Sequence, residues 1–180
     1  MILLIVLVYT THQTLIYQFH ANSAIRDEWQ DPFNNFDFNT CGGIQYFGKS
    51  TSDDWIVISR IFVDLEPHSH IIVDAEYLNI DYNYKPNFYI DEQYINYQSV
   101  ISSSQLCGNI QFDYINTISI IRQHNRRTVW IYIAQYYAGG GLISLRLSMI
   151  KCQYDVLDAQ RIIIQFVYNG NCINIHLIRN

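Results

Sequence analysis

The sequence predicts an all-β fold, an antiparallel β-sandwich with a jelly-roll-like arrangement and little or no helix. Strand-forming residues dominate the composition, with 15 Tyr and 9 Phe, and such residues favour pleated, half-buried surfaces. About ten short stretches are rich in β-branched and aromatic residues, and turn residues separate them every ~8–15 residues. No stretch repeats its apolar residues with the clear period of an amphipathic helix. Together these observations favour a sandwich over any helical or α/β fold.

The length and charge of the chain exclude several classes of protein. Its 180 residues give room for one domain with one core, and 49% hydrophobic against 15% charged residues is the balance of a globular chain. The formal net charge is −5, which argues against binding to nucleic acid or to an anionic membrane surface. No apolar run reaches the length of a transmembrane helix.

The first 24 residues resemble a secretory signal peptide. They contain no Asp, Glu, Lys or Arg, and the apolar run from Ile2 to Val8 has the length of a signal-peptide core. Ala21 and Ser23 supply the small residues of a cleavage site. We therefore expect residues 1–24 to be a signal peptide and the protein to be secreted or held on the extracellular face of the cell. The alternative is a buried N-terminal strand.

Four cysteines are candidates for disulfide bonds. None belongs to a CxxC motif, so zinc or thioredoxin-type chemistry has little support. An even number of cysteines behind a signal peptide predicts up to two disulfides, and three pairings are open. The four residues are Cys41, Cys107, Cys152 and Cys172.

The remaining chain divides into two parts. Residues 25–152 contain most of the predicted strands and form the expected sandwich domain, in which the run Gly139-Gly140-Gly141 predicts a break between strands. Residues 153–180 are a C-terminal extension in which two apolar runs flank Asn169-Gly170. Asn-Gly between apolar runs is a strong signal for a β-hairpin, so we expect a hairpin there.

The stretch from Leu65 to Gln93 organises the domain. It contains a long strand that ends near Ile80 and is followed by an acidic and aromatic loop. Alternation directs one set of side chains to the core and places Asp74 and Glu76 in water. The expected core-facing residues are Ile71, Val73, Ala75, Tyr77 and Asn79.

Aromatic and acidic residues around that loop are candidates for binding a ligand. Rings beside carboxylates and amides suit carbohydrate, because sugar faces stack on rings while their hydroxyls need planar hydrogen-bonding partners. Tyr94 and Tyr97 lie nearby in the sequence. The alternative is a half-buried, tyrosine-rich sheet without a ligand. The candidate binding residues are Asp81, Tyr82, Tyr84, Tyr89 and Asp91.

Catalytic and metal sites are weaker hypotheses. Asp81, Asp91 and Glu92 offer carboxylates for glycoside hydrolysis, which requires an acid pair at a defined separation. His68 and His70 could join an aspartate in binding zinc, but the spacing supplies no further ligands. We expect no cofactor, with structural Ca²⁺ on loop aspartates as the exception. Solvated carboxylates and histidines are the simpler interpretation.

A series of short motifs resembles the N-terminal modules of surface proteins from ciliates such as Paramecium and Tetrahymena. The motifs are Thr40-Cys41-Gly42-Gly43, Leu65-x-Pro67-His68, Ile80-Asp81, Phe88 to Gln93, Cys107-Gly108, His124 and Leu142 to Cys152. The resemblance covers residues 29–152 and implies a jelly-roll-like, galactose-binding-like module on a secretory-route protein. Two features depart from the family. The loop from Tyr82 to Asn87 differs, and only 28 residues, with one cysteine, follow Cys152 where Cys-rich furin-like or EGF-like repeats are expected.

The sequence thus favours a non-catalytic surface module with a structural or recognition role, whose partners are carbohydrate or other surface proteins. The alternative from another class is a secreted carbohydrate-active or metal-dependent hydrolase that uses the region of Asp81, Asp91 and Glu92. A third interpretation is a truncated gene product without an independent role. The extension after Cys152 motivates that interpretation.

Overall fold

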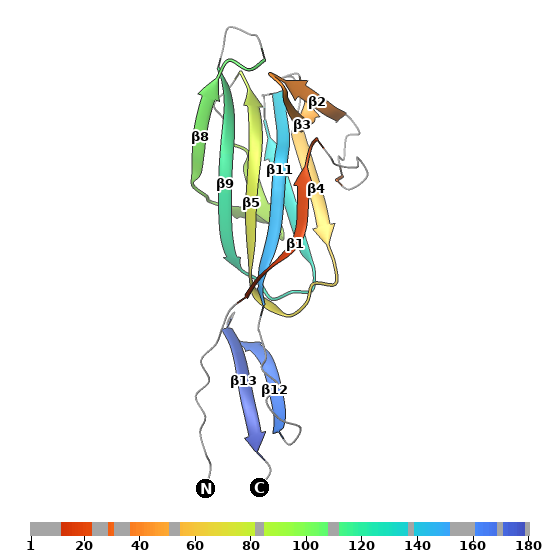
Figure 1. Cartoon of the computed structure of the whole chain (residues 1–180), viewed down its shortest axis with the longest axis vertical. Coiled ribbons are helices and arrows are strands. Elements are labelled where there is room, and N and C mark those ends of the chain that lie inside the picture. Colours follow the sequence, from red (N-terminus) through yellow and green to blue (C-terminus); the bar gives the residue numbers. More distant parts are fainter. Residues whose placement is uncertain are drawn as a thin grey trace.

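The computed structural model describes residues 12–22, 29–30, 37–50, 55–81, 85–107, 112–136, 139–151, 161–168 and 171–178. None of these residues is helical. Two antiparallel sheets pack against each other, and a separate two-stranded sheet lies beyond one end of them (Figure 1). The predicted all-β antiparallel sandwich is confirmed.

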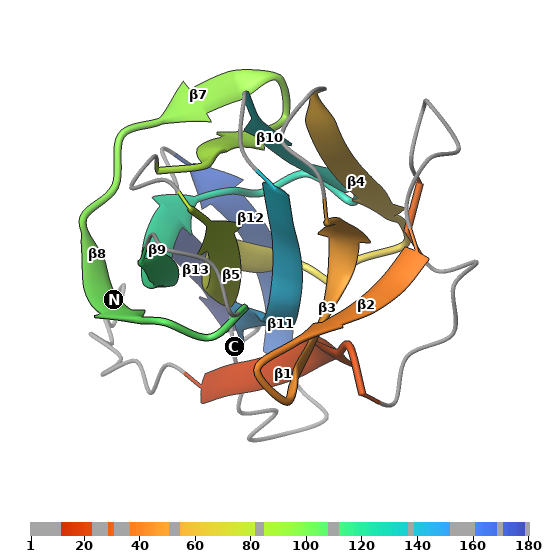
Figure 2. The same ribbon diagram turned by 90° about the horizontal axis from the view of Figure 1, so that it is seen from above.

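The larger sheet has seven strands. Its order is β2 (Asp37–Cys41), β3 (Ile44–Lys49), β11 (Gly139–Lys151), β5 (His68–Ile80), β9 (Asp113–Gln123) and β8 (Ser99–Ser104), with β1 (His12–His20) also paired to β11. The smaller sheet has four strands in the order β4 (Ile56–Phe62), β10 (Val129–Gln135), β6 (Asn87–Ile90) and β7 (Gln93–Ile95). Viewed from above, the two sheets face each other across the core (Figure 2).

The strand pairs are nested in the manner of a jelly roll. β6 pairs with β7, β5 with β9, β4 with β10 and β3 with β11, all antiparallel. This is the pattern of one long hairpin whose two arms are rolled together. Rolling the hairpin adds the pairs β5–β11 and β6–β10 and divides its strands between two sheets. β8 and β2 extend the larger sheet at its two edges.

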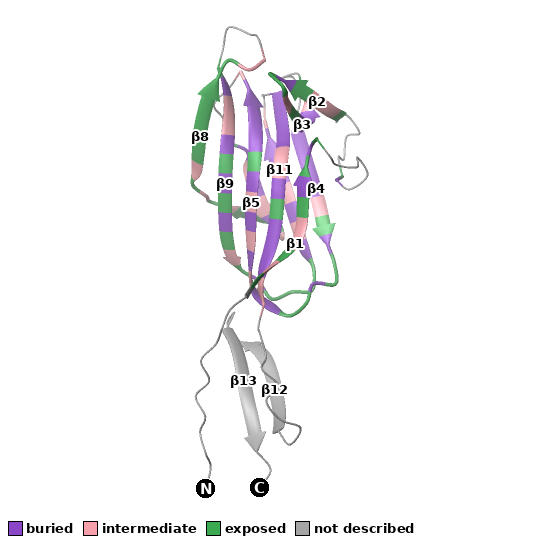
Figure 3. Ribbon diagram, viewed as in Figure 1, coloured by how far each residue is buried: buried purple, intermediate pink, exposed green. Residues whose placement is uncertain are grey.

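The core lies between the sheets and follows from strand alternation. On β5, every expected core-facing residue from Ile71 to Asn79 is buried, whereas Glu76 is exposed. On β10, Ile131 and Ile133 point to the same core. Figure 3 shows this as purple bands along the central strands.

A second apolar cluster lies on the outer face of the larger sheet. Leu78 and Ile80 belong to the face of β5 that carries Asp74 and Glu76, yet both are buried. They pack with a group made of Tyr46, Leu106 and the disulfide between Cys41 and Cys107. That bond is one of the pairings that the sequence left open. The side chains of Cys152 and Cys172 lie outside the described residues.

The run Gly139–Gly141 begins β11, so the prediction of a chain break at this run is wrong. A Cβ at Gly141 would lie 2.2 Å from the Phe47 carbonyl oxygen, and one at Gly140 would lie 1.9 Å from that of Leu78. Gly140 also has φ +140°, which other residues rarely adopt. The glycines therefore let β3, β11 and β5 approach closely.

Strands also form near both ends of the chain. β1 falls inside the segment with signal-peptide features and pairs with β11 from His12 to His20. This matches the alternative of an N-terminal strand, and the cleavage of residues 1–24 stays a prediction. β12 (Arg161–Tyr168) and β13 (Asn171–Ile178) pair antiparallel, as expected for a hairpin around Asn169-Gly170.

Candidate functional site

The two aspartates of the predicted binding site lie at opposite ends of the sandwich. Asp81 directly follows β5, whereas Asp91 contacts His124, which contacts His68 at the start of β5. The 13 residues of β5 separate these ends by roughly 40 Å of strand. The structure therefore does not bring Asp81 and Asp91 together, and their role in binding a ligand stays a prediction. Tyr82 and Tyr84 lie outside the described residues.

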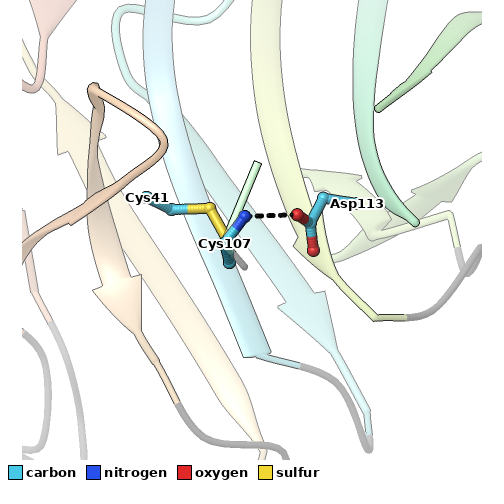
Figure 4. Close-up of side chains that lie close together, drawn as sticks. All are labelled: Cys41, Cys107 and Asp113. Atoms are coloured by element: carbon cyan, nitrogen blue, oxygen red, sulfur yellow. Dashed lines mark hydrogen bonds between the residues drawn. A yellow bond between two sulfur atoms is a disulfide. The ribbon is translucent and has the colours of Figure 1, made fainter. Parts of the chain in front are cut away.

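The end of the sandwich near Asp81 is held by a buried carboxylate that the sequence did not single out. Asp113 is 1% exposed. Its Oδ1 accepts a hydrogen bond from the backbone N–H of Asp81 at 3.1 Å, and its Oδ2 accepts from Leu106 and Cys107 at 2.8 Å each. Figure 4 shows Asp113 beside the disulfide that fixes Cys107 to Cys41. Asp81 thus belongs to a structural junction.

Tyr46 packs against this junction from β3. Burial, and then the charge of the nearby Asp113 carboxylate, raise the pKa of Tyr46 to about 12. Burial also raises the pKa of Tyr77 well above its ordinary value. Both phenols stay neutral near neutral pH, which suits side chains packed in apolar surroundings.

Tyr89 belongs to a row of aromatic side chains across the outer face of the smaller sheet. It is the cross-strand partner of Tyr132 on β10 and of Tyr94 on β7. The ring centroids lie 5.2 Å apart for Tyr89 and Tyr132 and 5.7 Å apart for Tyr89 and Tyr94, both edge-on. Trp130 continues the row, with its ring centroid 5.8 Å from that of Tyr132. We call these four side chains, from Tyr89, Tyr94, Trp130 and Tyr132, the aromatic face.

The described outward positions of the smaller sheet around the aromatic face carry no charged side chain. In the described part of the smaller sheet, the residues that share its outward direction are Val57, Ser59, Ile61, Asn87 and Ala134, as the strand registers show. Tyr94 is 57% exposed and Ile61 is 54% exposed, while the other three rings of the face are half-buried. Burial and neighbouring tyrosines raise the pKa of Tyr132, so its hydroxyl stays neutral. The face offers rings, hydroxyls and an amide to a ligand.

Asp91 and His124 close the other end of the sandwich. Asp91 and Glu92 form a two-residue turn between β6 and β7, with φ of 50° and 65°, which matches a type I′ hairpin turn. The Asp91 Oδ1 accepts from the Trp130 N–H at 3.0 Å, and the Asp91 N–H donates to the Trp130 carbonyl at 2.9 Å. The Asp91 Oδ2 lies 3.0 Å from His124 Nε2. Asp91 therefore has an internal partner on each oxygen.

The contacts continue from His124 into the larger sheet. His124 Nδ1 lies 2.8 Å from His68 Nε2, and His68 Nδ1 lies 2.6 Å from the Glu66 carbonyl oxygen. His68 is 1% exposed and His124 is 6% exposed. Burial lowers the pKa of His124, while the Asp91 carboxylate acts in the opposite direction. His68, His124 and Asp91 form what we call the histidine chain.

These positions bear on the metal and hydrolase hypotheses. His68 faces His124, whereas the His70 Nδ1 contacts the Ser69 hydroxyl at 3.0 Å, so His68 and His70 do not converge. Among the described residues, the group with ligand atoms close enough for a metal is Cys41, Cys107 and Asp113. Its two sulfur atoms are joined in the disulfide, and its carboxylate already accepts three backbone hydrogen bonds.

A groove of about 390 Å³ lies on the outer face of the larger sheet. Asp74 and Glu76 line it from β5, and each accepts a hydrogen bond from a serine, Ser119 at 2.7 Å and Ser144 at 3.2 Å respectively. Arg146 lines it from β11. The expected exposure of Asp74 and Glu76 to water agrees with this position, although Asp74 is only half-exposed.

Comparisons with known proteins add no family to the fold. No protein-family model matches the chain, and neither a curated protein nor a solved structure matches it. No helix among the described residues is long and apolar enough to cross a membrane. The chain is thus described by its own geometry, as a jelly-roll sandwich with an uncharged aromatic face.

Sequence reasoning found Tyr89 and Tyr94 but missed Trp130 and Tyr132, which complete the aromatic face. Their signal was present in the alternation of β10, where Trp130 and Tyr132 interleave with apolar core residues. What the sequence could not supply was the pairing of β10 with β6, because these strands are far apart in the chain.

Proposed function

We propose that the chain is a non-catalytic recognition module that binds neutral carbohydrate on the aromatic face. The observation that carries the proposal is the row of rings on Tyr94, Tyr89 and Tyr132, which crosses three strands of the smaller sheet. Aromatic rings present an apolar surface to the C–H faces of a sugar, and phenol hydroxyls can hydrogen-bond to its hydroxyl groups.

The absence of charge favours a neutral sugar over an acidic or basic ligand. The described outward positions of the smaller sheet carry no Asp, Glu, Lys or Arg, although the whole chain has a net charge of −5. A charged ligand would lose water on binding here without gaining an opposite charge. Secretion or display at the cell surface, as the N-terminal features and the ciliate resemblance suggest, is part of the same proposal.

Binding to a glycan array identifies the sugar, and titration calorimetry then measures its affinity. We expect Tyr94→Ala to weaken that affinity about tenfold, because loss of one stacking ring costs about 1.4 kcal/mol. Ile121→Ala is the matched control, since Ile121 is 67% exposed on the larger sheet, and it should bind like the wild type.

Two results would contradict the proposal. One is an array that shows no neutral glycan above background. The other is a bound glycan whose affinity is the same for the wild type, Tyr94→Ala and Tyr89→Ala. The hydrolase alternative receives no support from the positions of Asp81 and Asp91, and incubation of the bound glycan with the protein tests it directly through the appearance of cleaved product.

A further inference from the structure

The histidine chain has an unusual balance of hydrogen-bond donors and acceptors. Its two ends, the Glu66 carbonyl and the ionised Asp91 carboxylate, can only accept. Three contacts of 2.6, 2.8 and 3.0 Å join these ends through the four ring nitrogens of His68 and His124. Each contact needs one proton between its two atoms. Two neutral imidazoles carry only two protons.

A chain in which all three contacts are hydrogen bonds therefore requires one proton more than two neutral imidazoles and a carboxylate supply. That proton can be described as an imidazolium beside a carboxylate or as a carboxylic acid beside two neutral rings. Either way the net charge of the three side chains is zero. Without the extra proton, two lone pairs face each other at one contact in a buried place, which is costly.

We propose that His68, His124 and Asp91 form a buried site that binds a single shared proton and responds to acidification. This inference goes beyond carbohydrate recognition and does not rest on it. The site lies where β5 and β9 of the larger sheet meet the β6–β7 turn and β10 of the smaller sheet. A change in its protonation state therefore changes the hydrogen bonds that connect the two sheets at this end.

The connection to the aromatic face runs through the backbone of Trp130. Asp91 bonds to both the N–H and the carbonyl of Trp130, and it forms the turn that joins the strands of Tyr89 and Tyr94. Both turn residues have positive φ without being glycine, a conformation that needs support from its surroundings. The side-chain contacts of Asp91 supply that support.

Other charges near the site modulate it. Arg126 and the second histidine disfavour a positive charge on His124, and Asp91 favours it. The guanidinium of Arg122, from β9, donates to the Ile90 carbonyl at 3.4 Å and to the Gln93 side chain. Other charged groups described at this end are Glu92 in the turn, the ion pair of Glu66 with Lys151 and the ion pair of Asp64 with Arg127.

Asp91→Asn provides a sharp test. An asparagine can keep the bond from Trp130 to its oxygen and donate its own N–H to His124 Nε2. His124 Nδ1–H can then donate to His68 Nε2, and His68 Nδ1–H to Glu66. The chain is complete with two neutral rings and needs no extra proton. In the wild type, the neutral His124 ring should carry its proton on Nε2, because an ionised Asp91 can only accept a hydrogen bond. In the variant, the neutral ring should carry its proton on Nδ1.

The experiment is an NMR titration of the imidazole rings in the full chain, with ¹⁵N shifts reporting the tautomer. In the wild type we expect the rings of His68 and His124 to titrate together and take up one proton in total. In Asp91→Asn we expect the Nδ1–H tautomer of His124 at neutral pH and a midpoint at least about one pH unit lower, since the carboxylate that favours the charged ring is gone. His70→Gln, which changes a half-buried histidine on the same strand, should leave both rings unchanged.

Acid stability gives a second readout with a defined sign. Since burial lowers the pKa of His124, the unfolded chain binds protons at a higher pH than the folded chain. Stability is then full above about pH 6.5 and falls as the pH drops toward the folded pKa. Asp91→Asn should lose more stability than the wild type over this range, because its folded form takes up the proton at a lower pH.

Two separate midpoints with two protons taken up by the wild-type rings would overturn the proposal, and so would an Nε2–H tautomer of His124 in Asp91→Asn. The wild-type titration decides the number of protons even if the variant does not fold. A glycan array without hits would leave this result unchanged, so failure of carbohydrate binding and failure of the shared proton are distinguishable.

Discussion

Several polar side chains of this protein connect loops to strands and are not available to bind a ligand. Asp113, Asp91 and His124 each make contacts between segments that are distant in the chain. The sequence separation is 33 residues for Asp91 and His124 and 32 for Asp81 and Asp113. No local pattern encodes such contacts, which explains why the sequence suggested Asp81 and Asp91 as ligand-binding residues and gave no contact to Asp113 or His124. A buried carboxylate whose oxygens both accept hydrogen bonds within the protein has a structural role. An exposed carboxylate without such partners can bind a ligand.

Asp113→Asn tests this structural role. The amide group replaces one carboxylate oxygen with a donor, so at least one of the three backbone N–H groups at Asp81, Leu106 and Cys107 faces another N–H. We expect a loss of about 3 kcal/mol in the free energy of unfolding, since buried hydrogen bonds to a charged acceptor are strong. Urea denaturation measures the loss.

Asp64→Asn is the matched control for that substitution. The Asp64 side chain is 81% exposed in its ion pair with Arg127, and exposed pairs contribute little. Asn also tolerates the positive φ of this position. Equal unfolding curves for the two variants would show that Asp113 contributes no more than a surface carboxylate.

At the scale of strands, the alternation of side chains predicted correctly which face of β5 is buried. The run of glycines was a poor guide to where a strand begins. The core-facing residues of β5 follow directly from the period of two, because every second side chain must point to the same side. The run Gly139–Gly141 has the composition of a turn, yet it begins a strand. Glycine serves a turn and a close approach of backbones equally, and only the neighbouring strands decide which applies. Leu78 and Ile80 are buried on the outer face because a segment beyond β8 covers them.

Gly48→Ala tests the close approach of β3 and β11. A Cβ at Gly48 would lie 2.1 Å from the Gly140 carbonyl oxygen, so one of the two strands must move. We expect a destabilisation of about 3 kcal/mol, at the upper end for overpacking, measured by urea denaturation.

Gly43→Ala is the comparison for Gly48→Ala. A Cβ at Gly43 meets no atom within 4 Å, although its φ is +84°, so only conformational strain of about 1 kcal/mol is expected. If Gly48→Ala proved as stable as Gly43→Ala, the close approach of β3 and β11 at Gly48 would be refuted.

For the whole molecule, the nested pairing joins strands from all parts of the domain, and the disulfide adds a covalent link to it. The sequence predicted the sandwich because its strands are short, β-rich and separated by turns. It left the pairing of the cysteines open, since nothing in their spacing brings Cys41 of β2 near Cys107. In the fold, the bond fastens the segment after β8 over the outer apolar cluster, beside the hydrogen bonds of Asp113.

The bond between Cys41 and Cys107 joins residues 66 positions apart, and a loop of this length predicts a stabilisation of about 4 kcal/mol by the chain-entropy estimate. For a domain of this size, that corresponds to roughly 10 °C in Tm. We expect this decrease when the protein is melted with reductant. The double variant Cys152→Ser/Cys172→Ser serves as the control, because its melting should still respond to reductant if Cys41 and Cys107 carry the effect. A melt of that control that is the same with and without reductant would exclude a stabilising Cys41–Cys107 bond, and with it the strongest structural reason to place this protein in an oxidising compartment.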